Sequence, residues 1–277
     1  MSTISAADVN KLRLQTGAGM MDCKKALTEA GGDFDAAIEL LRKKGAKIAA
    51  NRADRESKEG AVIAKVNADG TVGVIVSLNC ETDFVAKNEG FVALAHQFAD
   101  IALQNQAADV NALKAMPIGS LTISDALTEQ IGKIGEKIDI NRYEILKGEN
   151  VVAYIHGANR LGVLVSLNKP RTEATALAGK DVAMQIAAMN PLAVDKEGVD
   201  ATLVQKEIEI GKELARQEGK PDAMLEKIAM GRLNKFYEEN TLLNQVFVKD
   251  SSKKISQMLD ETEKGLTVTA FKRVSLG

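Results

Sequence analysis

Val62–Asn79, which reads VIAKVNADGTVGVIVSLN, recurs 89 residues later as Val151–Asn168, VVAYIHGANRLGVLVSLN. The two stretches align without a gap, and 8 of their 18 positions are identical. Each has two apolar or alternating runs around a short turn, Ala68-Asp69-Gly70 in the first and Gly157-Ala158-Asn159 in the second. Two such runs around a tight turn are typical of a β-hairpin. The repeat therefore predicts a duplicated hairpin.

The two copies diverge directly after the repeat. The first continues as CETDFVAKN over 80–88, and the second as KPRTE over 169–173. An apolar helix is predicted after each, through Phe91–Leu103 and through Ala176–Met189. Each copy is thus a hairpin followed by a helix, an α+β arrangement with helices on one face of an antiparallel sheet. A duplicated scaffold with one specialised copy indicates that 80–88 is the working part.

Residues 1–54 are predicted to form a separate helical domain with its linker. Ser5 to Asp8 is typical of a capping box at a helix start, and the glycines of Thr16–Gly19 end that helix. Apolar residues then repeat at helical spacing in Cys23–Ala30 and in Phe34–Leu41. Three short helices of this kind resemble a ubiquitin-associated-type bundle.

The remaining chain is expected to form a core N-subdomain over 55–140 and a core C-subdomain over 141–277. In the first, residues 104–120 are interpreted as a loop or insertion. Ser124–Lys137 has helical spacing, and Ile140–Leu146 is predicted to be a strand.

An antiparallel helical hairpin is predicted at about 199–240, inserted in the C-subdomain. Gly219-Lys220-Pro221 is typical of a helix end followed by a helix start, because glycine suits the position after a helix and proline suits a first turn. Two short helices around such a turn form a short coiled coil. After it we expect a helix near Lys253–Asp260 and a strand near Leu266–Val274. Apolar or small residues recur at helical spacing on both sides of the turn: Val204, Ile208, Gly211, Ala215, Leu225, Ile228, Ala229 and Phe236.

Composition argues against several classes of protein. The chain has 36 Lys and Arg against 38 Asp and Glu, so it has no overall positive charge with which to neutralise phosphates. Tryptophan is absent and aromatic residues are 4%, which disfavours a base-stacking surface. No run of about 18 apolar residues and no signal peptide are found, so we expect a cytoplasmic protein without a membrane partner. Direct binding of nucleic acid is not expected.

Motifs for catalysis are missing as well. The sequence contains no GxxxxGK[ST], GxSxG or HExxH. The two cysteines, Cys23 and Cys80, lie far apart, and only His96 and His156 could supply imidazole ligands. Glu81 is treated as an isolated acid, because no histidine or ligand set accompanies it. We therefore expect neither an enzyme nor a bound metal or cofactor.

Thr82-Asp83-Phe84-Val85 stands out, because it follows a predicted strand at a loop-to-helix junction. Thr82 or Asp83 can cap the helix. The sequence leaves two interpretations of Phe84 open. Its ring either packs into the protein's own core or protrudes as a wedge towards another protein.

Two stretches, LRLQTGAGMMDCKKAL (Leu12–Leu27) and NCETDFVAK (Asn79–Lys87), resemble the elongation factor Ts family of bacterial translation. The agreement extends from near residue 5 to near residue 274. The resemblance implies a ubiquitin-associated-like N-terminal domain, a core of two related subdomains and a helical hairpin inserted in the second. The same family is matched by Ile134–Ile138, His156-Gly157, Gly219–Pro221 and Gly231–Phe236.

The resemblance implies a guanine nucleotide exchange factor for the GTPase elongation factor Tu. Such a factor binds the GDP form, speeds GDP release and binds no nucleotide itself. By resemblance, Thr82 to Val85 form the segment that leads to displacement of Mg²⁺ from the GTPase. Phe84 is then the wedge, and Asp83 helps to fix the loop and contacts the partner.

Two further contacts are implied in the same way. Arg13, Met20 and Met21 match the positions of an N-terminal contact, and His156-Gly157 resembles a weaker contact away from the nucleotide. Spacing alone favours a different interpretation, in which Arg13 is a solvated helix charge and His156 is a satisfied polar group beside a turn. Some members of the family continue into a C-terminal helical module that also contacts the GTPase. The resemblance does not imply that contact for this sequence.

Two alternative functions remain open from the residues themselves. A non-catalytic interaction scaffold with a ubiquitin-associated-type domain predicts that Phe84 is buried. An RNA-binding translation factor is the second, and the balanced charge argues against it.

Overall fold

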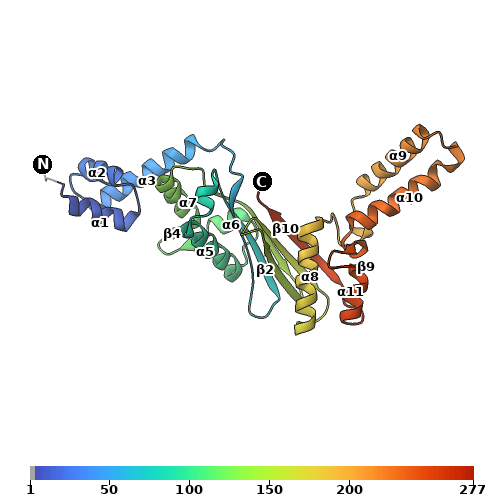
Figure 1. Cartoon of the computed structure of the whole chain (residues 1–277). Helices are drawn as coiled ribbons and strands as arrows, with labels where there is room; N and C mark the ends of the chain where they lie inside the picture. The colour runs from blue at the N-terminus through green and yellow to red at the C-terminus, as the bar shows by residue number, and fades with distance from the viewer. Residues whose placement is uncertain (1–3) are drawn as a thin grey trace. The chain divides into compact units, whose positions relative to one another are not determined.

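The structure is a computed structural model that describes residues 4–277 (Figure 1). Residues 1–3, which the sequence assigns to the helical domain, lie outside the described part. The chain divides into two compact units. Unit 1 comprises Met1–Ile63, Val76–Tyr143 and Ser275–Gly277, and unit 2 comprises Ala64–Ile75 and Glu144–Val274. The finer division into 1–54, 55–140 and 141–277 stays a prediction.

Three helices open unit 1: α1 (Ala6–Thr16), α2 (Met20–Glu29) and α3 (Phe34–Asn51). The capping box at α1 is present, because the Asp8 N–H donates to the Ser5 hydroxyl at 3.1 Å and the Ser5 N–H to the Asp8 carboxylate at 3.2 Å. Gly17, with φ +67°, ends α1, and Asp33 caps α3. The three predicted helices are therefore confirmed. Their small core contains Val9, Leu12, Ala18, Cys23, Ala26, Leu27 and Ala37.

Two glycines allow α3 to pack closely against α7 (Ile123–Ile134). A Cβ on Gly45 would lie 2.9 Å from the backbone oxygen of Thr128, and one on Gly132 would lie 3.0 Å from the Gly45 Cα. Helix backbones approach this closely only where no side chain intervenes. An ion pair between Arg42 and Glu129, with 3.0 Å between Nε and Oε1, also joins the two helices.

The first copy of the repeat forms the predicted hairpin. Its strands are β1 (Glu59–Val66) and β2 (Val72–Cys80), and the sheet order is β1-β2-β5, where β5 is Asp139–Lys147. The Asn67 side chain closes the turn by accepting the N–H groups of Thr71 and Val72 at 2.9 and 3.0 Å. Gly70 in this turn has φ +72°. A four-residue helix, α4 (Asp83–Ala86), and the longer α5 (Glu89–Asn105) follow.

The second copy forms β6 (Asn150–His156) and β7 (Leu161–Leu167), which pair antiparallel. Leu161 lies opposite His156, and the strand order is β10-β7-β6, with β10 at Val268–Ser275. Helix α8 (Glu173–Met189) lies along this sheet (Figure 1). The α+β class and the duplicated hairpin-plus-helix core are confirmed. Side chains shared by the sheet and α8 in the core include Val163, Val165, Val182 and Ile186.

The predicted helical hairpin is present as α9 (Ala201–Gln217) and α10 (Asp222–Asn240) (Figure 1). Gly219 has φ +74°, and Pro221 directly precedes α10. The helices touch where a Cβ on Gly211 would lie 3.1 Å from the Ala229 Cα. At the base, the Leu242 N–H donates to the Ala193 carbonyl at 3.0 Å, which joins the two ends of the insertion.

Residues 104–120, which the sequence indicates to be a loop or insertion, contain regular structure, so the loop alternative is wrong. Helix α6 (Val110–Lys114) begins at Asp109, whose carboxylate accepts the Ala112 N–H at 2.8 Å. A strand pair, β3 (Pro117–Ile118) and β4 (Leu121–Thr122), follows. Elements this short contain too few apolar positions to show a period. The chain ends with β8 (Val246–Phe247), β9 (Asp250–Lys254), α11 (Ile255–Thr262) and β10.

Gly45→Ala is expected to destabilise the protein, whereas Gly231→Ala is expected to be neutral or stabilising. Both glycines lie inside helices, where alanine is favoured by about 1 kcal/mol. The added Cβ meets nothing within 4 Å at Gly231, but it collides with the Thr128 carbonyl at Gly45. Such overpacking costs about 1–3 kcal/mol. Urea unfolding of both variants measures the difference, and equal midpoints would contradict the close packing of α3 on α7.

Candidate functional site

The turn that carries Phe84 lies between β2 and α5 (Figure 1). Thr82 caps α4 through a long contact of 3.5 Å from the Val85 N–H to its hydroxyl. Asn88 then caps α5 by accepting the Gly90 N–H at 2.9 Å. Between these two caps the Phe84 side chain is 84% exposed. The interpretation that Phe84 packs into the protein's own core is therefore wrong.

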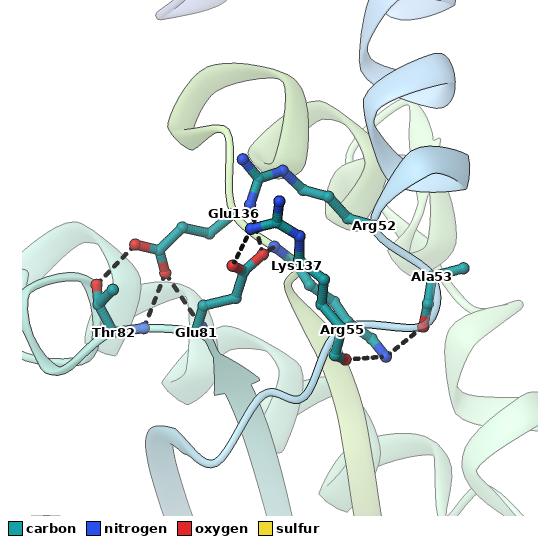
Figure 2. A network of polar contacts seen from close by, with 7 residues as sticks. All are labelled: Arg52, Ala53, Arg55, Glu81, Thr82, Glu136 and Lys137. Carbon is teal, nitrogen blue, oxygen red and sulfur yellow. Dashed lines mark hydrogen bonds and ion pairs between the residues drawn. The ribbon is translucent and has the colours of Figure 1, made fainter.

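A carboxylate from a distant segment holds the start of this turn (Figure 2). Glu136, between α7 and β5, accepts the N–H groups of Glu81 and Thr82 through Oε2, both at 3.1 Å. Its Oε1 accepts the Thr82 hydroxyl at 2.6 Å. Backbone N–H groups beyond a strand end need partners, which are otherwise water or a cap. One side chain therefore satisfies three donors immediately before Phe84.

Glu81 receives donors from two other segments (Figure 2). Its carboxylate accepts Arg52 Nη1 at 2.6 Å, Arg55 Nη1 at 3.1 Å and the Lys137 backbone N–H at 2.6 Å. Burial acts to raise the pKa of Glu81, but these donors outweigh it, so the pKa lies below the ordinary value. The Lys137 ammonium in turn donates to the carbonyls of Ala53 and Arg55 at 2.6 and 2.9 Å. Three chain segments thus meet at this corner.

Sequence reasoning did not predict Glu136 as a site residue, and it treated Glu81 as an isolated acid. The donors to Glu136 lie 54 and 55 residues away, and the arginines that bind Glu81 lie 26 and 29 residues away. No local sequence pattern indicates a hydrogen-bond partner that lies so far away along the chain. The one available signal was that Glu136 falls within Ile134–Ile138, a stretch that resembles the same family as the Phe84 segment.

Asp83 and Cys80 flank the turn in different ways. The Asp83 carboxylate lies 2.6 Å from Lys87 Nζ, and this contact holds the pKa of Asp83 below its usual range. Exposed pairs of this kind contribute little to stability, so Asp83 can exchange partners readily. Burial raises the pKa of the Cys80 thiol to about 12, and the thiol donates to the Thr82 carbonyl at 3.2 Å. Cys80 is therefore a protonated structural support.

The α1–α2 turn presents a second exposed apolar group. Met20 and Met21, which open α2, are 55% and 63% exposed, and Arg13 in the last turn of α1 is exposed as well. Leu14, which the sequence analysis does not single out, is 80% exposed. Exposed methionine and leucine side chains form adaptable contact surfaces. Leu14 could have been noticed because it lies two positions after Leu12 and therefore off the buried face of α1.

His156 and Gly157 lie at the turn between β6 and β7, in unit 2. The His156 Nδ1 is 3.0 Å from the Tyr154 hydroxyl, and Gly157 has φ +63°. This hydrogen bond satisfies one ring nitrogen. The three groups of candidate residues thus lie on separate elements: the α4 turn, the α1–α2 turn and the β6–β7 turn.

Within residues 4–277, no cluster of three or more His, Cys, Asp or Glu side chains is arranged to hold a metal ion. In the same part of the chain, every helix is too short or too polar to cross a membrane.

Comparison with known proteins identifies the class of protein to which this arrangement belongs. A family model described as Elongation factor TS matches residues 81–277. Elongation factor Ts of Amoebophilus asiaticus is 56% identical over 274 residues, 99% of each chain. The proteins of that name from Cytophaga hutchinsonii and Christiangramia forsetii are 56% and 54% identical over 277 residues, the full length of both chains. The chain belongs to the elongation factor Ts family of translation elongation factors.

The pH dependence of stability is expected to reveal the clamp on Glu81. Because the folded pKa is lowered, the stabilisation is complete above the unfolded pKa of about 4.3 and is lost as the pH falls through the folded value. Glu81→Gln should therefore lower the free energy of unfolding by about 2 kcal/mol near pH 7, and by progressively less below about pH 4.

The matched control is Glu39→Gln, which removes the carboxylate of an exposed ion pair with Lys43. Because both partners of this pair are exposed, the substitution is expected to have little effect on stability at neutral pH. Denaturant titrations at several pH values measure both variants. A Glu81→Gln effect that stays constant from pH 7 to pH 3 would contradict the lowered pKa.

Proposed function

We propose that the protein is a guanine nucleotide exchange factor for the GTPase elongation factor Tu, which binds the GDP form and promotes GDP release. Family membership supports the class of activity. The observation that carries the proposal is the 84% exposed Phe84 on a turn held by Glu136. Exposed aromatic side chains on ordered backbone are typical anchors of protein interfaces.

The mechanism follows from how GTPases hold their nucleotide. Mg²⁺ bridges the phosphates to protein oxygens, and a P-loop with its lysine surrounds the phosphates. In the proposal, Phe84 enters between side chains of the G domain, and Thr82 and Val85 orient it. The resulting shift displaces Mg²⁺ and weakens both sets of contacts to GDP. Asp83, which is released easily from Lys87, contacts the partner beside the wedge.

Thermodynamic coupling limits what such a factor does. Two ligands of one protein affect each other's affinity by the same factor. GDP must therefore weaken binding of the exchange factor as much as the factor weakens binding of GDP. The factor consequently changes the rate of exchange and leaves the final ratio of GDP to GTP unchanged.

Two further contacts belong to the proposal. Arg13, Met20 and Met21 would form an N-terminal contact. The exposed side chains of Met20, Met21 and Leu14 support an apolar surface there, and Arg13 is exposed as well. The region of His156-Gly157 would contact the partner away from the nucleotide. These contacts supply affinity, while the Phe84 turn acts on the nucleotide.

The alternative functions receive less support. A non-catalytic interaction scaffold predicts a buried Phe84, whereas the ring is exposed. An RNA-binding factor needs an excess of basic residues, and the net charge is −2. We also propose a cytoplasmic location, where a translation factor meets its partner.

Phe84→Ala is expected to slow GDP release while the protein stays folded. Loss of an interface aromatic costs on the order of 2 kcal/mol or more, which corresponds to about thirtyfold in rate. The side chain is mostly exposed, so the unfolding free energy should change by less than about 0.5 kcal/mol. Release of a fluorescent GDP analogue from the cognate elongation factor Tu, at catalytic amounts of this protein, measures the effect.

Met224→Ala is the matched control for Phe84→Ala, because Met224 is an apolar side chain 47% exposed on the helical hairpin. It should leave the exchange rate unchanged. A folded Phe84→Ala protein with the exchange rate of the wild type would remove the wedge role. Absence of acceleration by the wild type would remove the proposed function as a whole.

Replacement of Asp200–Glu239 by a short Gly-Ser linker is expected to retain most of the exchange activity. The ends of the insertion stay joined, because Leu192 donates to the Asn240 carbonyl at 2.8 Å and Leu242 donates to Ala193. The Phe84 turn is anchored only by residues outside the deletion in the contacts described above. The same GDP-release assay measures the outcome, and complete loss of activity in a folded variant would show that the hairpin takes part in exchange.

A further inference from the structure

We propose that Glu136 is a positioning residue for nucleotide exchange, which holds the Phe84 turn in one conformation before the partner binds (Figure 2). The proposal rests on the function proposed for Phe84. It adds a residue from a different segment, 52 positions further along the chain, that need not touch the partner.

The geometry around Thr82 shows how one carboxylate can orient the turn. Glu136 accepts both the backbone N–H and the hydroxyl of Thr82, at 3.1 and 2.6 Å. Two bonds to one residue define its backbone and its side-chain rotamer together, and a β-branched side chain has few rotamers to choose from. Because the hydroxyl proton is directed at Glu136, an oxygen lone pair remains for the Val85 N–H. Glu136 therefore also sets the cap of the helix that bears Phe84.

The turn has little else to hold it. Helix α4 has only four residues, Asp83–Ala86, and none of those four is fully buried. A helix shorter than about 12 residues is marginal in water without external contacts. Phe84, at 84% exposure, contributes little packing of its own. The conformation of this segment thus depends on its anchors at either end, which are Asn88 on one side and, on the other, Thr82 with its contacts to Glu136 and to the Cys80 thiol.

Glu136 is itself held on a rigid corner. Gly135, with φ +79°, ends α7 directly before it, and the next backbone N–H, that of Lys137, donates to Glu81 at 2.6 Å. The Lys137 ammonium binds the Ala53 and Arg55 carbonyls. A side chain on such a corner can transmit a fixed geometry, because the contacts of the adjacent Lys137 restrain its backbone.

Pre-ordering of this kind should affect the rate of exchange more than the affinity. Without Glu136, Phe84 samples several directions, and only a fraction of the bound complexes places the ring as a wedge. The N-terminal contact is unaffected. Glu136→Ala is therefore expected to lower the maximal rate of GDP release about tenfold, with at most a twofold change in the half-saturating concentration of this protein.

Two companion variants separate positioning from a general loss of structure. Glu136→Gln keeps one oxygen for the two N–H groups and offers an NH₂ group to the Thr82 hydroxyl, so its rate should be intermediate. Glu129→Ala removes a carboxylate of α7 whose ion pair is with Arg42 and should leave the rate unchanged. A Glu136→Ala rate equal to that of the wild type would overturn the proposal.

A double-mutant cycle tests whether Glu136 acts through Phe84. If it only positions the ring, the Phe84→Ala, Glu136→Ala double variant should be no slower than Phe84→Ala alone. If the fold-reduction in the rate of GDP release for the double variant instead equals the product of the two single reductions, Glu136 acts independently of Phe84. That result would overturn the positioning role.

Amide hydrogen exchange of the free full-length protein tests the positioning without elongation factor Tu. Glu136→Ala should speed exchange at the Glu81 and Thr82 amides and within α4, while protection in β6 and β7 stays unchanged. Unaltered protection at Glu81 and Thr82 would refute the anchor, even if the wild type proves active. Faster exchange there in a protein that does not release GDP would instead sustain the anchor and reject only the proposed function.

Discussion

The reciprocal clamp between two glutamates is the interaction on which the candidate site depends. The Glu136 carboxylate accepts the backbone N–H of Glu81, while the Glu81 carboxylate accepts the backbone N–H of Lys137 (Figure 2). Each side chain thus binds the backbone of the other's segment, and Arg52 and Arg55 provide positive charge beside Glu81. Bonds to ionised groups are roughly twice as strong as neutral ones. The clamp joins the three chain segments that contain Arg52, Glu81 and Glu136.

Duplication explains why one copy of the hairpin can support such a site. In the second copy, residues 168–171 connect β7 to Thr172, which caps α8 through a capping box. In the first copy, the connection contains the additional helix α4 before Asn88 caps α5. The buried strands and the long helix carry the stability in both copies. The connection of the first copy was therefore free to present an exposed aromatic residue without loss of the core.

Those parts of the fold that rest on local patterns were predictable. The hairpins follow from alternation around Gly70 and Gly157, and the helical hairpin follows from Gly219 and Pro221, whose backbone preferences need no distant partner. The loop alternative for residues 104–120 was wrong, since α6 is only five residues long and is too short to show a period. The sequence also singles out the candidate site, because the two copies diverge there.

By itself, the sequence determined the class of the fold, the order of most of its elements and the segment proposed as the candidate site. Periodicity, turns and caps act within a few residues, so they can be read along the chain. Tertiary structure alone decided that Phe84 is exposed and that Glu136 holds the turn beneath it. A hydrogen bond across 54 residues depends on how α7 and β2 end beside each other. No local property of α7 or β2 specifies that their ends lie side by side, because this arrangement results from the packing of the whole unit.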